Sequence, residues 1–290
     1  MSGHAQARTA APLDLVRRLP RLGPKHLVTL LITVILVVGE WRYGAIGGYP
    51  KLAGTLGACL AAEIALSLWL LGRFPALQSA YITGVSLTIL LRPAAGLFWP
   101  FVAGAVLSIG SKYVLRWRGR HLWNPSNLGI AVLLLLAPGQ VAVLSHELGN
   151  DLAANSVIWT LGLVVASRAR ILHVSATYVV SFAVLAALRA LLTGAPVQAE
   201  LAPLTGPMYQ LLTFFMLTDP RTTVGTRRGR MVTVALIALL ECGFRLANDF
   251  DLPGAAPFAP APAILALAIV GPIALALDLR RRAPAAGARA

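Results

Sequence analysis

Residues 124–127 read Asn-Pro-Ser-Asn directly before an apolar run, and residues 218–220 read Thr-Asp-Pro directly after another. A polar group placed in lipid costs free energy unless it finds partners. Polar residues at the ends of membrane-length apolar runs therefore serve either a ligand or the packing of helices. These two breaks are where we expect the chemistry of this chain to lie.

The composition places the chain among polytopic membrane proteins. Its 290 residues are 57% hydrophobic and 12% charged, with a mean hydropathy of +0.74. This combination excludes an ordinary soluble domain. We predict an all-α polytopic membrane protein with ten apolar runs, several of them shorter than the roughly 20 residues that cross a bilayer as a straight helix. The runs cover residues 26–40, 52–71, 77–91, 97–115, 124–138, 153–167, 171–192, 203–218, 231–247 and 262–279.

The basic residues are distributed unequally between the two sides that these runs define. Cytoplasmic loops of membrane proteins carry the excess of Lys and Arg. With the N-terminus inside, 20 of the 25 basic residues fall on inner segments. The outer segments keep only Arg42, Lys51, Arg92, Arg189 and Arg245. The charge distribution therefore predicts ten spans with both termini in the cytoplasm.

This topology divides the chain into three parts. Residues 1–24 form a cytoplasmic N-terminal tail, residues 25–280 an integral membrane domain, and residues 281–290 a basic C-terminal tail that we expect to be disordered. The net charge of +14 then reflects topology, with the bilayer and its anionic headgroups as partners. We expect no nucleic-acid partner.

Motifs of soluble enzymes and metal sites are absent from the sequence. It contains no G-x-S-x-G, no P-loop and no G-x-G-x-x-G after a strand, so a hydrolase or a nucleotide-driven pump has no support. Cys59 and Cys242 lie inside apolar runs without C-x-x-C spacing, which favours core positions over a disulfide. For His121 and His173, an interfacial or packing role is favoured over catalysis. We therefore expect no catalytic residue and no metal site in this chain.

The two halves of the chain carry a weak internal repeat. The third run ends in Arg92-Pro93 and the eighth in Asp219-Pro220, an offset of 127 residues and five runs. An odd offset inverts the direction of each run, and many transport folds consist of two halves inverted in the membrane. We predict two inverted five-helix repeats with short broken helices. Coincidence in a leucine-rich background is the alternative.

The predicted topology brings the two polar breaks to one side of the membrane. Asn124 and Asn127 are three residues apart, so both carboxamides can point one way in the first turn of a helix, whose start carries partial positive charge. With the carboxylate of Asp219, they could hold a flat heterocycle by hydrogen bonds to its edge. Asn124 could instead be a plain N-cap before Pro125, and residue chemistry alone favours this simpler interpretation.

Two longer stretches around the breaks resemble a known family. They are residues 123–129, WNPSNLG, and residues 205–223, TGPMYQLLTFFMLTDPRTT. A similar N-P-x-x-x-G turn and a similar phenylalanine-rich run into T-D-P occur in the NqrB/RnfD family. Its members are NqrB, a membrane component of sodium-translocating NADH:quinone reductase, RnfD, a membrane component of the Rnf electron-transport complex, and a related group found near enediyne biosynthesis genes. The resemblance extends loosely over the third to tenth runs.

The resemblance implies a flavin-holding subunit of an electron-transport complex in the bacterial inner membrane, coupled in the best-known members to movement of Na+ or H+. Relatives bind a non-covalent riboflavin near the cytoplasmic face. By motif position, its contacts here are Asn124, Asn127, Asp219 and the adjacent Thr218. The implied cofactor is therefore non-covalent riboflavin or FMN, and the implied partners are other membrane redox subunits.

One departure from the family concerns a second flavin. Relatives attach FMN through its phosphate to the Thr of an S-G-A-T stretch on the outer side. The nearest stretch here is Thr193-Gly194-Ala195-Pro196, with proline at the acceptor position. Proline has no hydroxyl, so we do not expect covalent FMN on this chain.

Three functions remain open at this stage. The first is a membrane redox subunit, at most part of an oxidoreductase or translocase. The second is a solute transporter or channel, because the ten-span plan with inverted halves resembles that of urea transporters. The third is an accessory membrane protein of a biosynthetic cluster without a cofactor.

Overall fold

The computed structural model describes residues 24–44, 46–143 and 151–282. The expected N-terminal tail lies outside this part of the chain except for residue 24, and so does the expected C-terminal tail beyond residue 282. The first described helix begins at Pro24 and the last ends at Arg281.

The chain is mostly helical, which confirms the helical class. Continuous helices satisfy every internal backbone hydrogen bond within one segment, as lipid requires. In the described residues the α-helices are α2 (Pro24–Tyr43), α3 (Tyr49–Leu71), α4 (Gln78–Leu90), α5 (Trp99–Val114), α6 (Pro125–Leu136), α7 (Leu152–Arg168), α8 (Leu172–Thr193), α9 (Val197–Leu201), α10 (Pro207–Leu211), α11 (Arg227–Asp249) and α12 (Pro262–Arg281). Shorter helical turns are η1 (Ala202–Thr205), η2 (Leu212–Met216) and η3 (Ala256–Phe258).

Four short strands, which the sequence analysis did not predict, form two antiparallel pairs. β1 (Leu91–Pro93) pairs with β4 (Val141–Val143), with Arg92 opposite Ala142. β2 (Arg116–Trp117) and β3 (Arg120–His121) form a hairpin. Its two turn residues, Arg118 and Gly119, have φ values of 51° and 78°, the positive values that a tight hairpin turn requires.

Four of the described helices, α3, α8, α11 and α12, are long and apolar enough to cross a bilayer. Other apolar helices are too short to cross alone in a straight path: α4 has 13 residues and α6 has 12. The expected eighth run is not one helix. It is divided into η1, α10 and the π-helical turn η2. These helices fit an all-α membrane protein that contains short and broken segments.

The outer surface of α8 is apolar, as expected for a helix in contact with lipid. Val180, Val184, Leu188 and Leu191 follow one helical face and are 62%, 63%, 46% and 82% exposed. The opposite face carries Tyr178, which is fully buried, together with Ser175 and other inward residues. A soluble protein rarely exposes such a continuous apolar stripe, so this face supports a membrane environment.

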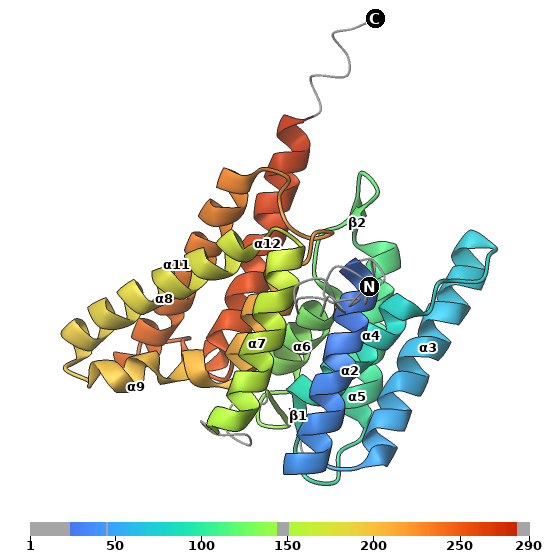
Figure 1. The fold of residues 1–290 in the computed structure, drawn as a ribbon, viewed down its shortest axis with the longest axis horizontal. Coiled ribbons are helices and arrows are strands. Elements are labelled where there is room, and N and C mark those ends of the chain that lie inside the picture. The colour runs from blue at the N-terminus through green and yellow to red at the C-terminus, as the bar shows by residue number, and fades with distance from the viewer. Residues whose placement is uncertain (1–23, 45, 144–150, 283–290) are drawn as a thin grey trace, which may run out of the picture.

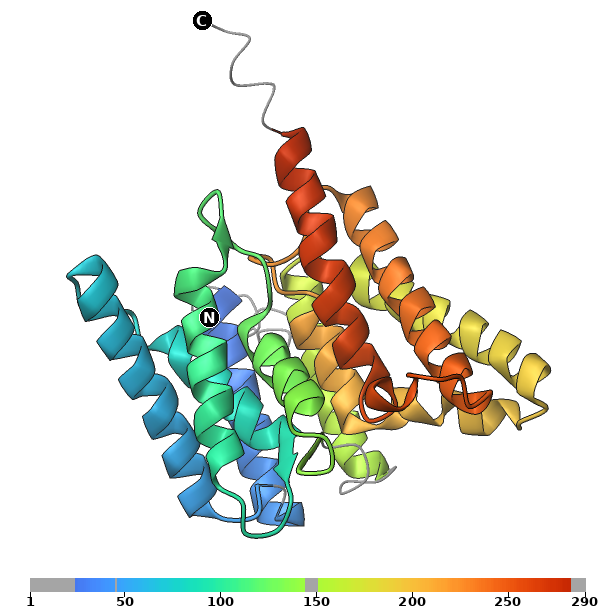
Figure 2. The ribbon, with the colours of Figure 1, turned by 180° about the vertical axis from the view of Figure 1, so that it is seen from behind.

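The helices pair in the same way in the two halves of the chain. In the first half α2 packs on α4, α3 on α5 and α5 on α6; in the second half α7 packs on α10, α8 on α11 and α11 on α12. Between the halves, the two first helices α2 and α7 touch, as do the two last helices α6 and α12. Figures 1 and 2 show the first half, in blue to green, beside the second half, in yellow to red.

The connections gather at two ends of the helical bundle. The β2–β3 hairpin lies at one end, where Arg120 donates to the carbonyl oxygen of Pro220 at 2.8 Å and Arg118 to that of Leu279 at 2.8 Å. The β1–β4 pair and α9 lie at the other end (Figure 1). Pro93 and Pro220, the prolines that close the third and eighth runs, therefore lie at opposite ends of the bundle.

Candidate functional site

Asn124 caps the N-terminus of α6. Its backbone is extended, with φ −65° and ψ 125°, and its side-chain Oδ1 accepts hydrogen bonds from the backbone N–H of Asn127 at 3.2 Å and the hydroxyl of Ser126 at 3.0 Å. Pro125 occupies the first helical position, where its missing N–H is no loss. The capping interpretation is therefore realised, but it uses only the oxygen of the carboxamide.

The nitrogen of the same carboxamide joins the two polar breaks. Asn124 Nδ2 donates to Asp219 Oδ2 at 3.3 Å, across 95 residues of sequence. Asp219 also accepts from the hydroxyl of Thr222 at 3.1 Å and from the backbone N–H of Arg221 at 3.0 Å. The structure thus brings Asn124 and Asp219 together, as the predicted topology requires, and orders the loop at residues 217–226 around the aspartate.

The hairpin holds this loop in place. The guanidinium of Arg120 donates to three successive parts of the loop, the carbonyl oxygens of Pro220, Arg221 and Thr223, at 2.8 to 3.2 Å. A guanidinium presents several donors in a fixed plane, so one side chain can satisfy carbonyls that no helix uses. Arg120 therefore positions Asp219 indirectly, a role that the sequence analysis did not assign.

Asn127 points toward another helix. It is 1% exposed, and its Nδ2 donates to the carbonyl oxygen of Ile264 in α12 at 3.3 Å. No hydrogen bond joins it to Asp219 in the described part of the chain. Its Oδ1 is buried and has no hydrogen-bond partner. Such an unmade bond costs about 1 to 3 kcal/mol, so this oxygen is an unused acceptor one helical turn from Asn124.

Thr218 is buried and its hydroxyl is already used. It donates to the carbonyl oxygen of Phe214, one turn earlier, where the π-helical turn η2 ends. Among the four predicted contact residues, Asn124 and Asp219 touch each other, Asn127 lies one turn away with a free acceptor, and Thr218 serves its own backbone. The side chain of Thr218 therefore offers less to a ligand than those of the other three residues.

A cavity of about 430 Å³ lies beside this site. His121 and Arg221, neighbours of the polar breaks, are among its lining residues, whereas none of the four predicted contact residues is. Burial, together with the charges of Arg116 and Arg221, lowers the pKa of His121, and Asp219 opposes this effect only weakly. We therefore treat His121 as a neutral imidazole at pH 7.

Charged side chains inside the helical bundle were missed by the sequence analysis. Glu63 of α3 forms an ion pair with Lys112 of α5 at 3.1 Å and accepts from the hydroxyl of Tyr113 at 3.0 Å. Glu241 of α11 is fully buried and accepts from the hydroxyls of Tyr178 and Tyr209, each at 2.6 Å. An ionisable residue within an apolar run is the signal that points to such pairs.

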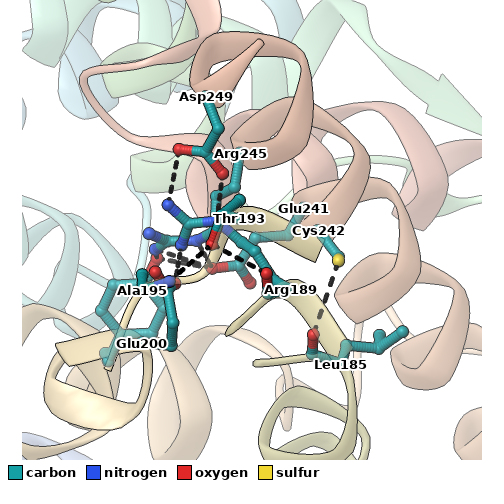
Figure 3. A network of polar contacts seen from close by, with 10 residues as sticks. Leu185, Arg189, Thr193, Ala195, Glu200, Glu241, Cys242, Arg245 and Asp249 are labelled. Atoms are coloured by element: carbon teal, nitrogen blue, oxygen red, sulfur yellow. Dashed lines mark hydrogen bonds and ion pairs between the residues drawn. The ribbon is translucent and has the colours of Figure 1, made fainter. Parts of the chain in front are cut away.

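The stretch Thr193-Gly194-Ala195-Pro196 lies next to a network of ion pairs (Figure 3). Arg189 bridges the carboxylates of Glu200 and Asp249, and Arg245 pairs with Glu241. The hydroxyl of Thr193 donates to the carbonyl oxygen of Arg189 at 2.9 Å. The position that would accept FMN in relatives is Pro196, the residue before α9, so the residues present here do not fit a phosphate-linked flavin.

Fold and site together define a helical membrane protein with a polar site at the end of a broken helix. No protein-family model matches the chain, and no curated protein matches it significantly. Within the described residues, no cluster of three or more His, Cys, Asp or Glu side chains has the arrangement of a metal site.

Proposed function

We propose that this chain is a membrane subunit of a flavin-dependent electron-transport complex and holds a non-covalent flavin at the end of α6. The observation that carries the proposal is the placement of Asn124 against Asp219, one helical turn from the unpartnered Oδ1 of Asn127. A carboxylate and a free carboxamide oxygen both accept hydrogen bonds, and a carboxamide nitrogen donates them.

The edge of a flavin ring offers the complementary groups. Its imide N–H is a donor for Asn127 Oδ1 or Asp219, and its carbonyl oxygens are acceptors for Asn124 Nδ2. The bound flavin would supply one- and two-electron transfer. The chain itself would bind and orient the ring, with Arg120 holding Asp219 through the loop.

The proposed topology has ten crossings in two inverted five-helix repeats, with both termini in the cytoplasm of a bacterial cell. Two observations support it: the repeated pairing of helices, and the basic side chains at the hairpin end, among them Arg73, Arg116, Arg118, Arg120 and Arg221. In this arrangement the flavin lies near the cytoplasmic face. Electrons would come from other membrane redox subunits.

Flavin content of the purified protein tests the proposal. We expect flavin absorbance in the wild-type chain when it is expressed with its neighbouring genes and purified in mild detergent. The Asn127→Ala variant should retain flavin about one to two orders of magnitude more weakly, because losing one buried hydrogen bond costs about 1 to 3 kcal/mol. Absence of flavin from the wild type would remove the redox proposal.

Gln210→Ala is the matched control. Gln210 is also a carboxamide, 1% exposed, with an unpartnered Oε1, but it donates to Asn155 at 2.7 Å, away from the polar breaks. It should destabilise the fold without loss of flavin per folded protein. Equal flavin loss in both variants would show a stability effect and count against the site.

A solute transporter is the second candidate, and the buried ion pairs favour it. Glu63 pairs with Lys112 across α3 and α5, and Glu241 pairs with Arg245 on α11 and accepts from Tyr178 of α8. Ionisable residues at such depth often line ion or solute paths. Solute flux into liposomes that contain flavin-free protein would support this function. If the protein shows neither solute flux nor bound flavin, the accessory role is the candidate that remains.

A further inference from the structure

The cavity beside the polar site lies at the hairpin end of the bundle. Its walls come from the connection between α3 and α4, the end of α5, the β2–β3 hairpin and the loop at residues 217–226. Its volume of about 430 Å³ is sufficient for a small ligand or the headgroup of a lipid.

The charge of the cavity is strongly unbalanced. Four basic side chains, Arg73, Lys112, Arg116 and Arg221, line it together with one carboxylate, Glu63. Lys112 is buried and neutralises Glu63 through their ion pair at 3.1 Å. The three arginines are exposed, and in the described chain none of them forms an ion pair. Arg116 donates to the carbonyl oxygen of Gly119 at 3.0 Å, a neutral group. The three arginines therefore bring positive charge to the cavity that no carboxylate balances.

The floor of the cavity carries an additional unused polar atom. His121 Nδ1 is buried and has no hydrogen-bond partner. A neutral imidazole can place a proton on this nitrogen and donate it to an anion. Burial of such a nitrogen beside unpaired guanidinium groups indicates that the pocket is shaped for a ligand with several acceptor oxygens.

One wall of the cavity is apolar and open to the outside. Leu71 and Phe74 line it and are 44% and 66% exposed, and the adjacent Trp69 is 81% exposed. Exposed aromatic and aliphatic side chains beside arginines are typical of the membrane interface, where acyl chains meet headgroups. A small soluble anion has no apolar part that could pack against this wall.

We infer that the cavity is a binding site for a phosphate group, held by Arg73, Arg116 and Arg221 and by the half-buried imidazole of His121. Guanidinium groups match phosphate oxygens in geometry and charge. The phosphate can belong to the headgroup of an anionic phospholipid or to a soluble phosphate. The apolar wall favours the phospholipid.

Native mass spectrometry of the full chain tests this inference. The protein is purified in detergent, stripped of lipid and titrated with phosphatidylglycerol, with phosphatidylcholine as the neutral comparison. We expect one phosphatidylglycerol molecule to be retained by the wild type. The double variant Arg73→Gln with Arg221→Gln should bind it about 25-fold more weakly, because each guanidinium near a charged headgroup contributes about five-fold.

The control variant removes the same charge from the same end of the bundle. Arg228 and Arg281 are exposed and do not line the cavity, so Arg228→Gln with Arg281→Gln should leave retention within about two-fold. An equal loss in both double variants would show that lipid is attracted by general surface charge, which would overturn the inference.

Inorganic phosphate identifies the source of the ligand. If phosphate protects the wild type against thermal unfolding, fails to protect the Arg73, Arg221 double variant, and phosphatidylglycerol is not retained, the site takes a soluble phosphate. Binding of neither ligand to the wild type would overturn the inference. Flavin content is measured in the same samples, so failure of this site and failure of the flavin site remain distinguishable.

Discussion

Asn124 shows how one carboxamide can serve structure and site at once. Its oxygen caps α6, and its nitrogen reaches Asp219 in a distant loop. The two roles are chemically separable, because serine and aspartate also cap helices but neither offers the amide donor. The simple capping interpretation and the binding interpretation therefore describe different atoms of the same side chain.

Substitutions at Asn124 should separate these two roles. Asn124→Ala removes both, and we expect the free energy of unfolding to fall by about 1 to 2 kcal/mol. Asn124→Ser keeps a capping oxygen and should recover about half of that loss, while flavin retention stays low in both variants. Thermal unfolding in one detergent measures the first effect. Equal stability of the two variants would show that the cap contributes little.

Glu241 is the buried carboxylate with the most partners. Two tyrosine hydroxyls and Arg245 surround it, and the carboxylate is fully buried. Its removal takes the acceptor from two tyrosine hydroxyls and the carboxylate from Arg245, whose guanidinium keeps, in the described chain, only its bond to the hydroxyl of Tyr209. Unpaired buried charge is the expensive outcome, because the protein interior cannot replace the lost hydration.

We expect Glu241→Ala to lower the free energy of unfolding by about 3 to 5 kcal/mol. Tyr178→Phe removes only one hydrogen-bond donor from the same carboxylate and should cost about 1 kcal/mol. Chemical denaturation in a fixed detergent and lipid mixture gives both values. Similar costs for the two variants would mean that Arg245 finds solvent or another partner when Glu241 is absent.

At the scale of helices, the apolar runs predicted the segments well and their contacts poorly. The break before Pro125 marks the start of α6 because proline and an N-cap are local signals. Gly206-Pro207 is a similar local signal where η1 ends and α10 begins, whereas the π-helical turn η2 lies in an apolar stretch without one. The hydrogen bond from Asn127 to Ile264 and that from Arg120 to Pro220 depend on tertiary packing, which the periodicity of the sequence does not encode.

Gly129 determines how closely α6 approaches α5. An alanine Cβ at this position would lie 2.2 Å from Ser108 Oγ and 2.9 Å from the carbonyl oxygen of Gly104. Ser108 Oγ belongs to a side chain that can rotate, but the carbonyl oxygen of Gly104 is backbone and moves only if a helix shifts. Small residues that allow such close approach are common where helices pack in membranes.

Gly129→Ala should therefore lower the free energy of unfolding by about 1 to 3 kcal/mol, despite the better helix propensity of alanine. Gly110→Ala in α5 is the control, because nothing lies within 4 Å of its added Cβ. It should be neutral or stabilising by up to about 1 kcal/mol. Adding Ser108→Gly to Gly129→Ala should recover part of the loss. Tolerance of Gly129→Ala alone would show that the two helices can separate freely.

At the scale of the whole molecule, the repeated helix pairing relates two halves whose sequences are hardly similar. The second and fourth helices pack together in each half, and each of these interfaces buries a carboxylate. Their partners differ: a lysine for Glu63, and tyrosines with an arginine for Glu241. The two interfaces therefore share a buried carboxylate but differ in the groups that pair with it.

The arrangement of the connections predicts which residues share a side of the membrane. Ala76 lines the cavity beside the hairpin, and Ser167 lies in the last turn of α7, which ends on the same side of the bundle (Figure 1). Ala95 follows β1, and Ala259 precedes α12, whose far end contacts the hairpin, so both belong to the opposite end. All four residues are exposed. Cys59 and Cys242 are buried, so their replacement by alanine gives a background for single cysteines at these four positions.

We expect cysteines at 95 and 259 to react with a membrane-impermeant maleimide in intact spheroplasts. Those at 76 and 167 should react only in inverted vesicles, because cytoplasmic loops carry the excess of arginine and lysine. The arrangement of the helices predicts which positions share a side of the membrane, and the distribution of basic residues predicts which side is cytoplasmic. The labelling outcomes test these two predictions separately. Reaction of all four with reversed sidedness would refute the orientation alone. Reaction of 76 and 95 from the same side would refute the proposed crossing of α4, and with it the inverted repeat.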